Sequence, residues 1–273
     1  MASFLRQMIL PTVIGMSVAF AAAQTPNQDD IIAQGGCAGC DLSLTEMRGL
    51  TVSGADFTSA DLKEADLKGA SLPGGIFVKA DLQRTEMERA VVSGADFSRA
   101  NMQGVDLEKS DASNASFVRA DMRRADLAEA ALTQSDFTEA DLRAAYLRRS
   151  DLARAVFRAA QLDDADFERA NLQGADFSDA RLPYADLDRV DARQASFRGA
   201  DLTGVSLASA DLTGSDLAGA DMRRAHLRRT NLSGADLTGV RNLDTRRLAR
   251  ACGDTTTKLP KGLSIKPCGE PED

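Results

Sequence analysis

A repeat of five residues constrains this chain more than any other feature. From Leu42 to Leu237, every fifth residue is apolar or small, which makes forty consecutive units without an insertion or deletion. The residue two places before each centre is small, usually Ala, and the residue between the two is mostly Asp or Asn. A sequence with this pattern must fold as a series of equivalent short units.

The five-residue step excludes both common secondary structures. On an α-helix five residues advance by about 500°, so successive centres would lie about 140° apart and would form no apolar stripe. In a plain strand the side chains alternate with a period of two, so successive centres would point to opposite faces. What remains is a short extended piece, whose small residue and centre both face inward, followed by a bend. The chain is therefore predicted to coil around its own interior.

The phenylalanines indicate how many units make one coil. Every Phe after residue 23 is a centre, and only Phe167 lies outside a series with a spacing of 20 residues. Four units are therefore predicted to form one coil, with the rings stacked at about 4.8 Å, and ten coils would form a rod of roughly 48 Å. Ser-Gly and similar pairs recur on one side and fit type II turns, whose third residue needs a positive φ. The predicted core ladder contains Phe57, Phe77, Phe97, Phe117, Phe137, Phe157, Phe177 and Phe197.

The repeated Ala-Asp-Leu-Xaa-Xaa units, as at residues 60–62 and 65–67, resemble the pentapeptide repeat family. The resemblance covers most of the chain and implies an all-β fold, a right-handed quadrilateral β-helix of about ten coils over residues 41–240. It also implies that the central Leu and Phe and the preceding Ala fill the interior. Ala112 and Ala192 are small centres, so the interior is predicted to be loosely filled there.

A solenoid exposes apolar surface at both ends, so each end needs a cover. Residues 24–40 are predicted to form an N-terminal linker and cap, and residues 241–273 a C-terminal cap. Asp244 is a suitable N-cap for a short capping helix that Gly253 would end, and an irregular tail would follow. The apolar residues expected to pack against the repeats are Ile31, Ile32, Leu248, Ala251, Leu259, Leu263 and Ile265.

The first 23 residues have the pattern of a secretory signal peptide. Arg6 precedes an apolar run at residues 8–20, which ends in the small residues Ala21, Ala22 and Ala23. The run of about 13 residues is shorter than the roughly 20 that a membrane-spanning helix needs. The pattern predicts export to the periplasm or the cell exterior, with no membrane span in the mature chain, and an uncleaved N-terminal anchor is the alternative.

The four cysteines lie outside the repeats, at Cys37, Cys40, Cys252 and Cys268. Disulfide Cα atoms must approach within about 7 Å, which excludes pairs that would cross a rod of about 48 Å. Only Cys37 with Cys40 and Cys252 with Cys268 can pair within one chain, and export makes their oxidation plausible. The Cys-Ala-Gly-Cys sequence lacks a redox-domain context, and Asp41 stands where haem attachment needs a histidine.

Composition argues against catalysis, cofactors, metals and nucleic acid. His226 is the only histidine, occupies an outward slot near several arginines, and is expected to be a surface residue. The net charge of −8 disfavours direct nucleic-acid binding. Aspartates at multiples of 20 could attract cations, but Asp beside a turn more often accepts backbone N–H bonds. This column contains Asp61, Asp81, Asp121, Asp141, Asp201 and Asp221.

The favoured hypothesis is a non-enzymatic secreted or periplasmic scaffold that presents a repetitive polar surface to a protein or envelope partner. The partner and the oligomeric state stay open. The resemblance implies an alternative, because some relatives resemble B-form DNA and bind DNA gyrase in the cytoplasm. The export signal, the interleaved arginines and the absence of projecting loops argue against this alternative. An enzyme is a third and weaker reading, because the regular rod predicts no cleft.

Overall fold

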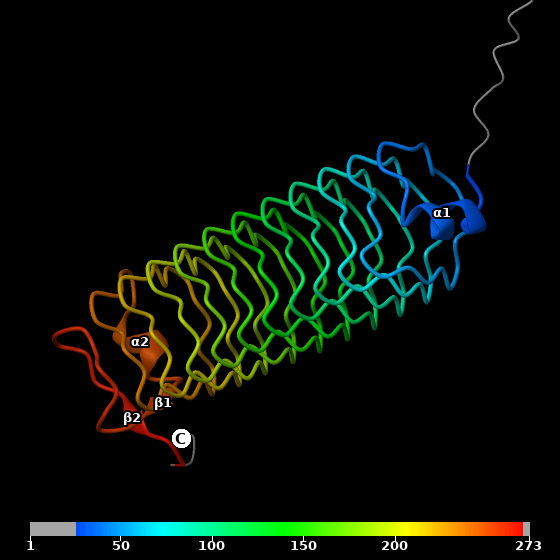
Figure 1. Cartoon of the computed structure of the whole chain (residues 1–273). Helices are drawn as coiled ribbons and strands as arrows, with labels where there is room; N and C mark the ends of the chain where they lie inside the picture. Colours follow the sequence, from blue (N-terminus) through cyan, green and yellow to red (C-terminus); the bar gives the residue numbers. More distant parts are fainter. Residues whose placement is uncertain (1–25, 270–273) are drawn as a thin grey trace, which may run out of the picture.

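A computed structural model describes residues 26–269, and the predicted signal peptide at residues 1–23 lies outside this range. Figure 1 shows a straight stack of coils between α1 (Gln28–Gln34) at one end and α2 (Thr245–Leu248) at the other. Two short strands, β1 (Cys252–Gly253) and β2 (Lys266–Pro267), lie beside α2. The elements outside the repeats therefore gather at the two ends of the stack.

Hydrogen bonds between adjacent coils hold the stack together. Parallel bridges join residues 20 apart, such as Asp61 with Asp81, so four five-residue units form one coil. The N–H of Leu62 donates to the carbonyl of Asp81 at 2.7 Å, and the N–H of Asp81 donates to the carbonyl of Ala60 at 2.9 Å. Each unit thus forms only a very short piece of parallel β-structure, and its partners lie in the coils before and after it.

A bend with one left-handed residue follows each centre. At most bends, the first residue of the next unit donates back to the carbonyl of the preceding centre, as where the N–H of Ala65 donates to the carbonyl of Leu62 at 3.1 Å. The residue two places after the centre has a positive φ in all forty units, including Gly54 at 65°, Glu64 at 55° and Arg84 at 53°. A left-handed conformation costs a residue with a Cβ about 1–2 kcal/mol. The pairing between coils therefore imposes this conformation even where the sequence provides no glycine.

The interior is a set of apolar columns. The eight phenylalanines spaced by 20 residues are fully buried or nearly so and form one stacked column, with adjacent ring centroids 4.6–5.2 Å apart. Phe167 meets Phe157 and Phe177 edge-on at 5.8 and 5.9 Å. Offset stacking and edge-to-face contacts are both favourable for aromatic rings. Ala112 and Ala192 are also fully buried among these columns.

The N-terminal end differs from the predicted linker. The pairing between coils begins at Gly36, which bridges to Asp56, and Cys37 occupies a central position one unit before Leu42. The preceding helix α1 starts after Asn27, whose side-chain oxygen accepts the N–H of Asp30, while the Asp30 carboxylate accepts the N–H of Asn27. Ile31 of this helix is buried, whereas Ile32 is 48% exposed. The expectation that both isoleucines cover the first coil is therefore wrong for Ile32.

The C-terminal end corrects two further expectations. Helix α2 ends at Leu248, so Gly253 does not stop the helix but lies in β1, which pairs in parallel with β2. The N–H of Cys252 donates to the carbonyl of Thr230 at 3.0 Å, so this segment continues the pairing of the coils. The tail is thus partly ordered by β-pairing rather than an irregular loop, and Leu248 and Ala251 are buried beneath it.

Candidate interaction surfaces

The aspartates before the centres support the turns. The N–H of Lys63 donates to Oδ1 of Asp61 at 3.1 Å, and the N–H of Thr58 donates to Oδ1 of Asp56 at 2.8 Å. The hydroxyl of Thr58, followed by its N–H, holds the pKa of Asp56 below its ordinary value. The described residues contain no group of three or more His, Cys, Asp or Glu side chains that could hold a metal ion. The aspartate column thus has a structural role in the turns.

Ion pairs connect the outer faces of neighbouring coils. Arg119 binds Glu139 of the next coil through two bonds of 2.7 and 3.1 Å, and this contact lowers the pKa of Glu139. Lys63 lies 3.0 Å from the carboxylates of both Asp61 and Asp81. An exposed pair of this kind contributes less than about 1 kcal/mol. Their main effect is a surface on which acidic and basic side chains face each other rather than one continuous acidic face.

A hollow of about 620 Å³ lies along one corner of the rod. At the turn position of successive coils on this corner, long and short side chains alternate, with Arg84, Gly104, Arg124 and Ala144 in order. The two short residues leave space between the arginines. We call this hollow the arginine–glutamine groove, and it is lined by Gln83, Arg84, Gln103, Gly104, Arg123, Arg124, Arg143 and Ala144.

The groove presents mainly hydrogen-bond donors. Arg123 binds the carboxylate of Asp121 through bonds of 2.8 and 2.7 Å, and the amide of Gln103 donates to the same carboxylate at 2.8 Å. Both Arg123 and Gln103 are therefore held in place by the carboxylate of Asp121. Among residues 26–269, the side chain of Arg124 has no hydrogen bond or ion pair, so its guanidinium can serve an external acceptor. Carbonyl or carboxylate groups of a protein partner match such a lining.

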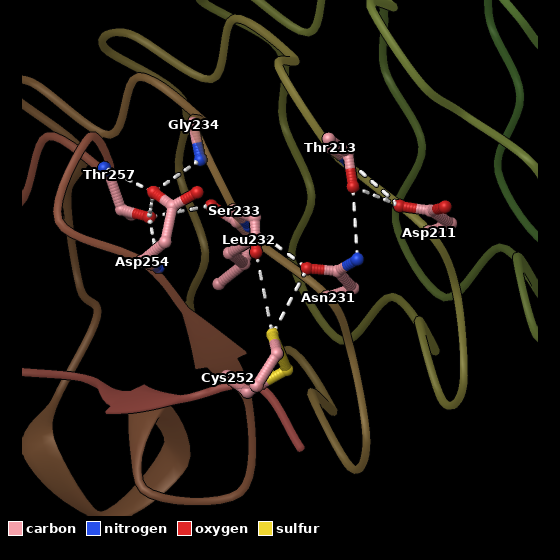
Figure 2. The surroundings of a disulfide bond; sticks show 10 residues. Asp211, Thr213, Asn231, Leu232, Ser233, Gly234, Cys252, Asp254 and Thr257 are labelled. Atoms are coloured by element: carbon pink, nitrogen blue, oxygen red, sulfur yellow. Dashed lines mark hydrogen bonds between the residues drawn. A yellow bond between two sulfur atoms is a disulfide. The ribbon is translucent and has the colours of Figure 1, made fainter.

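A disulfide joins Cys252 of β1 to Cys268 after β2, with Cα atoms 4.8 Å apart. Figure 2 shows the polar residues of the last coil around this bridge. The sulfur of Cys268 lies 3.2 Å from Oδ1 of Asn231 and 3.4 Å from the hydroxyl of Ser233. The carboxylate of Asp254 accepts the N–H of Gly234 at 3.1 Å. The bridge and these bonds therefore attach the C-terminal segment to the repeats.

The second disulfide joins Cys37 and Cys40, whose Cα atoms are 5.6 Å apart, at the other end of the stack. No free cysteine occurs in the described part of the chain. His226 is exposed in the slot where most units have Asp, and its backbone N–H donates to the carbonyl of Val205 at 2.9 Å.

The geometry defines a class of protein: a four-sided β-helix built from five-residue units. The family model for pentapeptide repeats matches residues 60–241 with eight copies, which is more than half of the chain. The chain belongs to the pentapeptide repeat family, whose members form right-handed β-helices. No curated protein matches the sequence. Within residues 26–269, no helix is long and apolar enough to cross a bilayer.

Several solved structures are similar to this chain. HetL, a pentapeptide repeat protein involved in heterocyst differentiation regulation in the cyanobacterium Nostoc, is 27% identical over 80% of this chain and 94% of its own, with a TM-score of 0.45. A thylakoid-lumen pentapeptide repeat protein of Arabidopsis thaliana is 31% identical over 43% of this chain and 74% of its own, with a TM-score of 0.33. QnrB1, a plasmid-mediated fluoroquinolone resistance protein, is 22% identical over 68% of this chain and 89% of its own, with a TM-score of 0.34.

Some of these features could be recognised in the sequence, and the groove could not. The cysteines and the phenylalanine series were singled out from sequence, and the structure places the cysteines at the ends and the phenylalanines in the interior. The arginine–glutamine groove was not anticipated. Its signal was the alternation of Arg with Gly or Ala at positions 84, 104, 124 and 144, which is visible only once the sequence is written in rows of 20.

Proposed function

We propose that this protein is an exported, non-enzymatic scaffold: a rod of about ten coils that presents a polar surface to a protein partner in the periplasm or outside the cell. The observation that carries the proposal is the uninterrupted register of forty units, whose outward charges are largely paired with one another. Pentapeptide repeat proteins are typically non-enzymatic scaffolds. A short helix, α2, and the segment after it close the C-terminal end of the rod.

Two observations support export. The apolar run at residues 8–20 precedes three alanines, and two disulfides close the segments at the ends, as is usual in an oxidising compartment. Cell fractionation of the native host, followed by N-terminal sequencing, tests the proposal, with Gln24 expected as the first residue. Ala23→Phe should prevent cleavage, while the neighbouring Thr25→Val should be processed normally. Soluble cytoplasmic protein with an intact Met1 would overturn the export proposal.

The arginine–glutamine groove is the surface we assign to the partner. Arg124 and Arg99 form a matched pair, because both are exposed, both have a positive φ at the same turn position, and neither side chain has a bonding partner among residues 26–269. They lie on different corners of the coil. Proximity labelling in the native envelope should therefore lose its main labelled protein in Arg124→Glu and keep it in Arg99→Glu. Equal labelling in both variants would contradict this assignment.

A gyrase assay tests the alternative that the family resemblance raises. Because guanidinium groups face the outward carboxylates, as in the pairs Arg119–Glu139 and Arg148–Asp166, the surface is a poor imitation of a continuous phosphate backbone. We expect the purified protein to leave DNA supercoiling by gyrase unchanged, with and without a fluoroquinolone. Inhibition of supercoiling, or relief of the drug effect, would favour a gyrase-binding role over the scaffold.

A further inference from the structure

The C-terminal end of the rod carries a charge opposite to that of the whole chain. Residues 223–250 contain eight arginines, one histidine and only two aspartates, which gives this segment a net charge of +6 in a protein of net charge −8. The family fold does not require this reversal, because elsewhere the same outward slots hold acidic and basic residues in mixture. The segment therefore creates a local positive field that attracts anions.

One residue explains why Arg228 has no carboxylate partner within its own unit. In several other units, the Asp before the centre pairs with an Arg two positions further along the chain, at 2.7 Å for Asp121–Arg123 and 2.6 Å for Asp191–Arg193. In the unit at residues 225–229, His226 occupies the Asp slot and Arg228 occupies the Arg slot. The usual internal carboxylate is missing there, and Arg228 forms no ion pair with any residue in the range 26–269.

The unpaired arginines surround a hollow of about 140 Å³ between the last coils and the segment that contains α2. Arg246 and Arg250 have no side-chain partner within residues 26–269, whereas Arg247 binds Asp244 at 2.8 Å. Among residues 26–269, the lining contains no carboxylate and consists of Ala225, His226, Leu227, Arg228, Arg246, Arg247 and Arg250. Several guanidinium groups thus converge on one small space.

The backbone holds both walls of this hollow in place. The N–H of Arg229 donates to the carbonyl of Arg250 at 2.7 Å, which fixes the segment after α2 against the last coil. The side chain of Asp244 caps α2, and Leu248 of this helix is completely buried. The arginines therefore project from a fixed framework, so binding an anion requires ordering of their side chains but no rearrangement of the backbone.

We propose that this hollow, here called the C-terminal arginine site, binds a phosphate group through Arg228, Arg246 and Arg250. Guanidinium groups match phosphate oxygens in a bidentate geometry, and the small volume suits one such group rather than a folded partner. The group is either free phosphate or the phosphomonoester headgroup of an anionic lipid. The site lies apart from the arginine–glutamine groove, so the inference does not depend on the proposed scaffold function.

Calorimetric titration of the purified protein with inorganic phosphate tests the proposal. We expect saturable binding of one phosphate per chain, and at least about tenfold weaker binding in Arg228→Ala, because a charge-assisted contact is lost. His226→Asp should weaken binding to a similar extent by restoring the internal carboxylate for Arg228. This variant introduces the residue that the repeat itself uses, so it is expected to fold with an unchanged melting temperature.

Two control variants lie far from the site. Val156→Asp adds a carboxylate to the equivalent slot of a unit that also carries Arg, and Arg158→Ala removes a guanidinium that is paired with Asp176. Both should bind phosphate as the unchanged protein does. No saturable binding, equal binding in His226→Asp and the unchanged protein, or equal weakening in the controls would each overturn the proposal.

Vesicles distinguish the two sources of the phosphate group. The probe is phosphatidylcholine vesicles with and without phosphatidic acid, in a flotation assay. Binding only to the vesicles with phosphatidic acid, lost in His226→Asp, would identify a lipid headgroup as the ligand. Saturable binding of inorganic phosphate without vesicle binding would identify a free phosphate, and both results support the site.

Discussion

The middle of the rod and its two ends solve the same physical problem in different ways. In the middle, every coil has equivalent neighbours on both sides, as where Phe117 stacks with Phe97 and Phe137 at 5.1 and 4.8 Å. At each end a coil has only one such neighbour, and elements outside the repeat cover it: α1 with a short disulfide loop, or α2 with β1, β2 and a longer one. Repetition thus stabilises only the interior of a stack, and the ends need their own sequences.

The largest expected effect comes from breaking the stack in its middle. Phe117→Asp places a carboxylate between two rings in a fully buried position and should cost several kcal/mol, about 4 or more. Arg119→Ala, two residues away, removes only an exposed pair with Glu139 and should change stability by less than about 1 kcal/mol. Urea unfolding followed by circular dichroism measures both. Comparable losses would contradict the assignment of inward and outward positions.

The two disulfides test how strongly each end depends on its cover. Replacing both Cys252 and Cys268 by Ala opens a loop with a sequence separation of 16 and should cost about 3 kcal/mol, whereas the Cys37–Cys40 pair, with a separation of 3, should cost about 2. In the variant without the Cys252–Cys268 bridge, hydrogen exchange should show reduced protection of the backbone amides at residues 252–267. The amides of the coil around Phe117 should stay protected. If removal of the Cys37–Cys40 bridge reduced the free energy of unfolding more than removal of the Cys252–Cys268 bridge, loop length would not determine how much each disulfide stabilises the protein.

Geometric periods made the middle of the rod predictable from sequence. A step of five excludes the helix and the plain strand, and the spacing of 20 between phenylalanines sets four units per coil, which the bridges such as Asp61–Asp81 reproduce. The left-handed conformation of Glu64 and Arg84 was not predictable from residue type, because Gly is the residue that normally marks it. There, pairing between coils overrides local preference.

The ends and the binding surfaces were less predictable because they lack a period. Strands β1 and β2 have two residues each, which is too short for alternation to be visible, and their pairing joins positions such as 252 and 266 that no repeat relates. The capping box of Asn27 and Asp30 was a local signal for α1 that the prediction of a linker overlooked. The arginine–glutamine groove depends on differences between residues 20 apart, whereas the search for repeats emphasises what such residues share.

Two serines in one interior column provide a smaller and more discriminating test of the middle. The hydroxyl of Ser110 is buried without a hydrogen-bond partner, whereas the hydroxyl of Ser150 donates to the carbonyl of Leu147 at 2.6 Å. Ser110→Ala should therefore stabilise the protein by about 1 kcal/mol, and Ser150→Ala should destabilise it by a similar or smaller amount. Thermal unfolding of both variants measures the effect. A change in stability of the same sign in both variants would show that hydrogen bonding does not determine whether Ser or Ala is favoured at these positions.

The smallest expected effect is a pH response at the C-terminal end. The hydroxyl of Thr238, followed by the ammonium group of Lys258 and the N–H of Thr238, lowers the pKa of Asp236 to about 2. Because the pKa in the folded state lies below the ordinary value, the stabilisation is fully present above about pH 4 and is lost as the pH falls towards 2. Lys258 belongs to the C-terminal segment, and its backbone N–H also donates to the carbonyl of Ala235 at 2.9 Å.

Lys258→Met should therefore raise the pKa of Asp236 part of the way towards its ordinary value, since the bonds from Thr238 remain, and should reduce the dependence of stability on pH between 4 and 2. Carbon-detected NMR titration of the Asp236 carboxyl group measures the shift directly. Lys266→Met, in β2, removes an ammonium group that forms no ion pair within residues 26–269 and should leave this titration unchanged. Equal shifts in both variants would mean that the pKa of Asp236 responds to the total charge of this end of the rod, and not to its ion pair with Lys258.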